Sequence, residues 1–168
     1  MCARKVARSK VVGSKKKVSN KSPRRLKKLK MARVSDLDDV WQTFRAHKEL
    51  FPHVWKTKIR KKIKDRKVIY HDGVVITYLP YKRRSWVGDV LYEKGDIHLQ
   101  QIVKHPDSKA NASRILKSFI DMNEGKVVLS VRRDNRHARR FYKKNQMKEV
   151  GRISWSDGSL EGVVVESR

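Results

Sequence analysis

The sequence predicts a mixed α/β protein in which a partly antiparallel, twisted sheet is flanked by helices. Three observations support this fold class. Apolar residues recur at helical spacing early in the chain, at Leu37, Val40 and Phe44. Two strand-like runs then flank Asp72-Gly73, a dipeptide that favours a tight hairpin turn. Further along, an apolar strand is twice followed directly by a helical pattern.

The first half is expected to hold two helices and a hairpin. Ser35 and Asp38 give the first helix a capping-box-like start, and Phe51-Pro52 interrupts it because proline cannot continue the hydrogen-bond ladder. The elements predicted here are a helix from Ser35 to about Leu50, a strongly basic helix around Trp55, Ile59 and Ile63, and strands over 67–70 and 74–78.

The second half is expected to alternate strands and helices and to end in a hairpin. Residues 81–86 are expected to form a basic, aromatic loop. The elements predicted after it are strands over 88–91 and 97–103 with a Lys94-Gly95 turn between them, a helix over 110–122 that Gly125 ends in the C′ position, a strand over 127–131, a helix over 135–145, and two strands around Asp157-Gly158.

The charge of the chain is strongly positive. Its 168 residues, a one-domain length, include 43 Lys and Arg against 17 Asp and Glu, giving a net charge of +26. The first 33 residues hold nine Lys, five Arg and no acid, and the remaining 135 still carry 29 basic against 17 acidic residues. Such a field implies a polyanionic partner, most often nucleic acid, and it argues against small cationic amines, which need an acidic groove.

Residues 1–30 are expected to be a disordered basic tail, and residues 31–168 the folded domain. The tail has too few apolar residues to offset its ordering entropy. It is either a solubilising arm or, given its charge density, an arm that orders on contact with phosphates. Its predicted nucleic-acid-binding residues are Lys15, Lys16, Lys17, Arg24 and Arg25.

The location predicted from the sequence is the cytoplasm, that of the host if the chain is phage-encoded. The single cysteine, Cys2, excludes an internal disulfide framework, and residues 1–30 contain no apolar segment typical of a secretion signal. No membrane contact and no metal site are predicted.

The segment Ile102 to Leu116 is the first candidate site, a strand that ends in a proline turn and leads into a helix. A helix N-terminus offers unpaired N–H groups and the positive end of the helix dipole, which together bind pyrophosphate. Small side chains would let an anion approach the backbone there, and Lys109 adds a cation. Arg114 either reaches a phosphate or is a solvated helix residue. Any strand–turn–helix has such a start, so this segment alone is weak support.

A second candidate segment places Asn135, Ala138, Phe141 and Tyr142 on one helix after a strand. Asn135 is suited to cap the helix and can also pair with an amide-bearing ligand. Ala138 allows close packing. Tyr142 lies two turns further on, where its hydroxyl could protonate a leaving group.

In this order and spacing, the two segments resemble the GNAT superfamily of N-acetyltransferases, over about residues 31–165. The family signature V-x-P-x-x-R-G-x-G-x-G/A matches Val103 to Arg114 in part. The signature N-x-x-A-x-x-F/L-Y matches Asn135 to Tyr142 at each defined position. The chain departs from the first signature at the family's glycines, which fall at Ala110, Ala112 and Arg114, and at the usual Arg or Gln, which is Lys109.

The resemblance implies a GNAT-like fold and an N-acyltransferase that uses acetyl-CoA or another acyl-CoA. It assigns the pyrophosphate to the backbone of Lys109, Ala110, Asn111, Ala112 and Ser113, with Arg114 beside them. It assigns the pantetheine arm to the strand at Val103 and to Asn135, and protonation of the departing thiolate to Tyr142.

A general base is expected on or before the long strand, at Glu93, Asp96 or His98. His98 has the best unperturbed pKa for the task and is the predicted base, although a lone strand histidine is more often structural.

The predicted acceptor is nucleic acid, in particular DNA. Lys56 and Arg60 lie near Trp55, and Arg83 and Arg84 lie near Trp86, a mixture that suits base stacking with phosphate contact. The same pattern also fits core aromatics beside solvated cations.

Within the GNAT superfamily, the chain is similar to the phage Mom-type proteins, which modify adenine in DNA, in its size, basic charge and element order. A target adenine would then have to leave the base stack. Two alternatives stay open: a protein N-acetyltransferase for ribosomal or nucleoid proteins, and a non-catalytic nucleic-acid-binding module.

Overall fold

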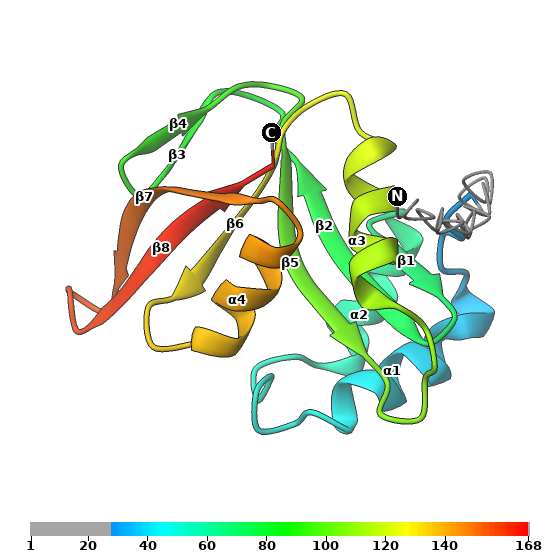
Figure 1. Cartoon of the computed structure of the whole chain (residues 1–168). Coiled ribbons are helices and arrows are strands. Elements are labelled where there is room, and N and C mark those ends of the chain that lie inside the picture. Colours follow the sequence, from blue (N-terminus) through cyan, green and yellow to red (C-terminus); the bar gives the residue numbers. More distant parts are fainter. Residues whose placement is uncertain (1–27, 168) are drawn as a thin grey trace, which may run out of the picture.

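The computed structural model describes residues 28–167, which form a six-stranded sheet with helices on both faces and a separate two-stranded hairpin (Figure 1). The tail residues Lys15, Lys16, Lys17, Arg24 and Arg25 lie outside the described residues. Leu29 and Lys30 already belong to the fold: Leu29 packs against the core, and the carbonyl of Lys30 accepts a hydrogen bond from the Tyr70 amide.

The elements follow the predicted alternation of helices and strands. In chain order they are η1 (Val34–Asp36), α1 (Leu37–Arg45), α2 (Lys56–Lys64), β1 (Val68–His71), β2 (Val74–Pro80), β3 (Ser85–Val87), β4 (Val90–Tyr92), β5 (Ile97–Lys104), α3 (Ala112–Asp121), β6 (Val127–Arg132), α4 (Arg136–Lys144), β7 (Lys148–Trp155) and β8 (Leu160–Glu166). Within residues 28–167, no helix has the length and apolar character needed to cross a membrane.

The sheet has the order β1-β2-β5-β6-β8-β7, and every neighbouring pair is antiparallel except β5 and β6. The parallel pair is very short, because β5 and β6 are in register only at Ile97↔Val127 and His98↔Val128. Beyond these residues the two strands diverge, as Figure 1 shows. The edge of β5 that faces β6 therefore has no strand partner from Leu99 onward within the described chain.

Three groups of side chains cover the sheet. On one face, α3 and α4 pack over the largest core cluster, which includes Leu99, Phe119 and Leu129. On the other face, α1 and α2 pack against β1, β2 and β5. The β3–β4 hairpin covers β6 and β8 on this second face, where Tyr92 contacts Val128.

The helices that follow β5 and β6 have side-chain caps, as the sequence indicates. The Asn111 Oδ1 atom accepts a hydrogen bond from the Arg114 amide at 3.1 Å and caps α3. The Asn135 Oδ1 atom accepts one from the Ala138 amide at 3.0 Å and caps α4, as predicted.

Three local predictions are wrong. The first helix ends at Arg45 rather than Leu50, because successive turns replace it before Pro52. Residues 85–87 form β3 rather than loop, and Gly88 belongs to the turn between β3 and β4 rather than to a strand. Gly88 has a φ of +61°, and a Cβ there would collide with the Arg152 carbonyl on β7.

Gly125 does not end α3 in a left-handed conformation, because its φ is not positive. It is needed for a different reason: a Cβ at this position would collide with the carbonyl of Gly95. The two loops that precede β5 and β6 therefore pass each other at backbone contact distance.

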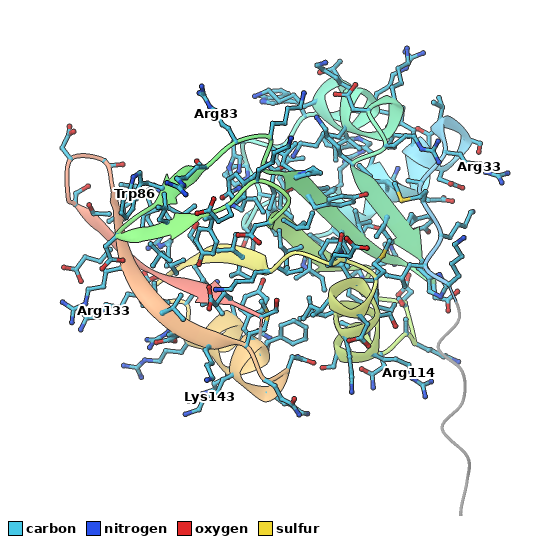
Figure 2. The ribbon with its side chains drawn as sticks, turned by 90° about the horizontal axis from the view of Figure 1, so that it is seen from above. Arg33, Arg83, Trp86, Arg114, Arg133 and Lys143 are labelled. Carbon is cyan, nitrogen blue, oxygen red and sulfur yellow. The ribbon has the colours of Figure 1, made fainter. Side chains whose placement is uncertain are left out.

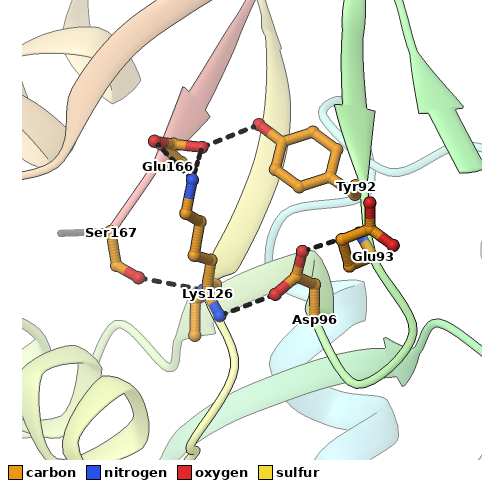
Figure 3. Close-up of polar contacts among 7 residues, drawn as sticks. Tyr92, Glu93, Asp96, Lys126, Glu166 and Ser167 are labelled. Carbon is orange, nitrogen blue, oxygen red and sulfur yellow. Dashed lines mark hydrogen bonds and ion pairs between the residues drawn. The ribbon is translucent and has the colours of Figure 1, made fainter. Parts of the chain in front are cut away.

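Hydrogen bonds tie these two loops together at the closed end of the β5–β6 opening (Figure 3). The Asp96 carboxylate accepts from the amides of Glu93 at 2.9 Å and Lys126 at 3.0 Å. The Glu166 carboxylate accepts from the Tyr92 hydroxyl and from Lys126 Nζ, both at 3.3 Å. These contacts hold β5 and β6 together where their own pairing is only two residues long.

Replacing Asp96 with Ala should therefore destabilise the protein by about 1–3 kcal/mol, because two backbone amides lose their acceptor. Urea unfolding of Asp96→Ala and the wild type measures the difference. Asp121→Ala, a change at the exposed end of α3, is the control and should stay within about 0.5 kcal/mol of wild type. Equal stability of both variants would show that the Asp96 contacts contribute nothing to the fold.

Candidate active site

The opening between β5 and β6 is flanked by the two helices that follow these strands. On the face that α3 and α4 cover, the helices touch, because Asn145 Nδ2 donates a hydrogen bond to Ser113 Oγ at 3.2 Å. An extended ligand chain lying in the opening can satisfy the free backbone groups of β5, as an added strand would.

The α3 N-terminus presents free amides beside this opening. Within the described chain, the N–H groups of Lys109, Asn111, Ala112 and Ser113 have no hydrogen-bond partner. The Ala110 N–H differs, because it donates to Ser108 Oγ at 3.1 Å. The predicted pyrophosphate cradle thus offers four of its five amides.

The side chains around this cradle are basic and exposed. Lys109 and Arg114 are exposed, and neither has a carboxylate within 4.0 Å among residues 28–167. Figure 2 shows Arg114 extending outward from α3. A phosphate at the helix start would therefore meet free amides and two mobile cations.

The loop that carries the cradle is anchored to the β1–β2 turn. Ser108 Oγ donates to the Asp72 carbonyl at 2.6 Å, and the His105 amide donates to the Gly73 carbonyl at 2.8 Å. Asp72 and Gly73 have φ values of +50° and +77°, as the predicted tight turn requires. The turn therefore fixes where the first amides of α3 point.

Tyr142 lies in the core beneath α4, with its side chain 9% exposed. Burial raises the pKa of Tyr142 to about 12, so the hydroxyl stays protonated at neutral pH. Among the described residues, the hydroxyl makes no hydrogen bond, yet no fully buried side-chain oxygen lacks a partner. The hydroxyl therefore reaches solvent-accessible space and can donate a proton to a ligand.

Two other predicted contacts have restricted roles. The oxygen of Asn135 caps α4, so only its amide nitrogen is left to meet a ligand. Val103 is 5% exposed and packs in the core on the α1–α2 face. Its backbone, rather than its side chain, can contact a ligand in the opening.

Of the three candidates for a general base, the two carboxylates are used structurally. Glu93 pairs with Arg84, whose Nε lies 3.0 Å from Oε1, and Asp96 accepts the two amides described above. His98 points to the α2 side of the sheet, and its ring stacks on Tyr81 with centroids 5.9 Å apart. Burial, and secondarily the charge of Lys62, lower the pKa of His98 below its ordinary value of 6.5.

If His98 is the base, activity should be full above a pKa lower than 6.5 and should fall as pH drops through it, because only the neutral imidazole accepts a proton. The measurement is kcat/KM from about pH 5 to 8. His98→Ala should lose this acid limb and about 100-fold in rate.

His53→Ala, at an exposed position, is the control and should keep the profile. Folding stability must be followed in parallel, because a histidine with a lowered pKa also destabilises the fold as pH falls below 6.5. An unchanged acid limb in His98→Ala would exclude His98 as the base.

The predicted nucleic-acid contacts of the described chain divide into paired and free cations. Lys56 pairs with Asp38, and Arg84 pairs with Glu93. Arg60 and Arg83 are exposed and have no such partner within residues 28–167. Figure 2 shows Arg83 on the side of α1 and α2, opposite Arg114 and Lys143.

A basic groove along α4 is absent from the residues predicted to bind nucleic acid. Its volume is about 790 Å³, and it lies between α4 and the start of β7, on the side of α4 away from α3. Its lining cations are Arg136, Arg139, Arg140, Lys143 and Lys148. Its one carboxylate, Glu149, is held by Arg139 at 2.7 Å. The density of Arg and Lys in residues 136–144 was the sequence signal for this groove.

Solved structures with a similar fold are acetyltransferases. A GNAT-family acetyltransferase from Bacillus cereus superposes with a TM-score of 0.60 at 15% identity, covering 83% of this chain and 95% of that one. The ribosomal-protein-S18-alanine N-acetyltransferase from Escherichia coli gives 0.54 at 15% identity, over 82% and 90%. Arabidopsis thaliana NAA60 in complex with acetyl-CoA gives 0.57 at 14% identity, over 83% and 97%.

No protein-family model and no curated protein matches the sequence. The resemblance in sequence is therefore confined to short motifs, whereas the similarity in structure spans most of the chain. The protein has the GNAT-like fold that the two motifs predict, and the opening between β5 and β6 is part of that fold.

Proposed function

We propose that this protein is an acyl-CoA-dependent N-acyltransferase, with acetyl-CoA as the donor. The observation that carries the proposal is the β5–β6 opening, because a free strand edge, four free amides and a protonated tyrosine border it. The fold similarity to NAA60, which was solved with acetyl-CoA, supports the same donor.

Each part of the chain has a distinct task in this proposal. The free amides at the start of α3, with Lys109 and Arg114, hold the pyrophosphate. The free edge of β5 and the amide nitrogen of Asn135 hold the pantetheine arm. Acyl-CoA supplies a thioester carbonyl that an amine can attack.

Two side chains move protons. His98, neutral because its pKa is lowered, accepts the proton of the attacking amine on the α2 side of the sheet. Tyr142, protonated because its pKa is raised, donates to the departing sulfur. The first pKa is depressed and the second elevated, so both groups are in the required state at neutral pH.

For the acceptor, we propose nucleic acid, modified as in the phage Mom-type branch at adenine in DNA. The net charge of +26, the free cations Arg60 and Arg83 and the α4 groove support a polyanion. Trp86 is 66% exposed near Arg83 and can stack on a base.

A second candidate is a protein N-acetyltransferase. It is favoured by the neighbours themselves, which include an enzyme named for ribosomal protein S18 and the NatB acetyltransferase complex. The positive charge would then serve to bind a ribosome or nucleoid rather than the acceptor amine.

Two measurements separate these functions and the non-catalytic alternative. Calorimetry of the full chain with acetyl-CoA should show saturable binding, and its absence would leave only the non-catalytic binding module. Mass analysis of nucleosides from cells that express the protein should then show a modified adenine. An unmodified adenine profile together with newly acetylated ribosomal proteins would establish the second candidate instead.

A further inference from the structure

Lys62 stands out on α2 as a half-buried ammonium group that no acid faces. Its Nζ donates a hydrogen bond to Gln100 Oε1 at 2.7 Å. Burial first, and then the charges of Lys58 and Lys67, lower the pKa of Lys62. The surroundings therefore disfavour the charge that this lysine must carry at neutral pH.

The acids near α2 are engaged elsewhere. Asp38 pairs with Lys56, and Asp65 lies 3.5 Å from Lys61 and 3.8 Å from Lys67. Within residues 28–167, Lys62 has no carboxylate within 4.0 Å. An ammonium group carries three donors, so the bond to Gln100 leaves two without a protein acceptor in the described chain. A charge in this position gains most from an anion supplied by a ligand.

The position of Lys62 relates it to the closed end of the β5–β6 opening. His98 is the last residue of β5 that pairs with β6. Gln100 lies opposite no residue of β2, because Leu99 and Gln101 face the adjacent residues Tyr78 and Thr77, so it forms a β-bulge. The bulge turns Gln100 toward Lys62, on the same face as His98.

We propose that Lys62 binds a phosphate group of the acceptor and thereby places the acceptor amine beside His98. The proposal rests on the acyl-transfer function for the location of the reacting amine. It defines the acceptor as a phosphate-bearing molecule, and it disfavours polyamines and the N-termini of basic peptides, whose charge Lys62 would repel. Lys62 is a positioning residue, and Gln100 fixes the direction of its Nζ.

The first test follows the lysine side chains of the full-length protein, labelled with ¹³C at Cε, by NMR. Lys62→Arg removes one signal and so assigns Lys62. Single-stranded DNA of about twelve nucleotides, a common site size, or deoxyadenosine monophosphate should raise the pKa of Lys62, because an anion stabilises the ammonium form. Deoxyadenosine, which lacks the phosphate, should leave it unchanged.

The DNA and mononucleotide arms distinguish a polymer phosphate from a terminal one, and a response to either supports the proposal. A response to inorganic phosphate alone, to a basic N-terminal peptide, or to no probe overturns it. This test needs neither acetyl-CoA nor turnover. A protein that binds no acetyl-CoA but shows the Lys62 response would contradict the acyltransferase function and leave the phosphate site standing.

The second test measures steady-state rates. Lys62→Met should raise the KM for the nucleic-acid acceptor about tenfold or more, since a charge-assisted contact is lost, with kcat and acetyl-CoA affinity unchanged. Lys62→Arg should keep the wild-type KM, because it keeps the charge. Lys61→Met, one residue earlier on the exposed side of α2, is the matched control and should change the KM less than twofold. Equal KM changes in Lys61→Met and Lys62→Met would overturn the proposal.

Discussion

Replacing Tyr142 with Phe should lower the kcat for acyl transfer about 100-fold or more, because general acid catalysis contributes on the order of 10²–10⁴. The change removes only the hydroxyl, which makes no hydrogen bond to the described residues. The fold and acetyl-CoA binding should therefore survive. The measurement is the release of free thiol from acetyl-CoA in the presence of the acceptor, with thermal unfolding run on the same samples.

Tyr70→Phe is a suitable control, because Tyr70 is also partly buried but lies on β1, at the far edge of the sheet. This variant should keep the wild-type rate. If a slow Tyr142→Phe variant recovers its rate with a donor whose thiol is more acidic, Tyr142 acts on the leaving group. Wild-type turnover of Tyr142→Phe with acetyl-CoA would exclude the tyrosine as the acid.

Raising the salt concentration from 50 to 200 mM should weaken DNA binding about a thousandfold, if six or more phosphates are contacted. The expected contacts come from residues 1–27, which contain eleven Lys and Arg, and from the cations of the folded domain. Deleting residues 1–27 should flatten the plot of log affinity against log salt by several units, since each lost phosphate contact removes about 0.9. Leu29 and Lys30 contact the sheet, so this truncation leaves the described fold complete.

Arg140→Gln, in the α4 groove, provides a graded comparison and should reduce the slope by about one unit. Fluorescence anisotropy with a labelled duplex at several salt concentrations gives both slopes. An unchanged slope after the deletion would remove residues 1–27 from DNA binding and leave the folded domain as the binding surface.

The sequence was most informative where a signal is local. The caps at Asn111 and Asn135 and the Asp72-Gly73 turn depend on neighbours a few residues away, so the residue types alone indicate them. The β3–β4 hairpin was misplaced because three-residue strands show too little alternation. Gly125 was misread because its constraint is the Gly95 backbone, thirty residues earlier.

The candidate site shows the same division between local and distant information. Tyr142 and His98 were found from a motif and from the pKa of histidine. Their burial, which gives their pKa values opposite shifts, required the structure. The contact between Lys62 and Gln100 joins residues 38 positions apart through a bulge, and no sequence period indicates it.

The two-residue pairing of β5 with β6 also affects how amide protons exchange with solvent. Along β5, amides that point toward β2 are held in a long antiparallel ladder, whereas those beyond His98 that point toward β6 are not. A single strand should thus contain slowly and rapidly exchanging amides in alternation. A ligand lying along the free edge would slow the second group alone, so deuterium uptake by one strand would report occupancy of the opening.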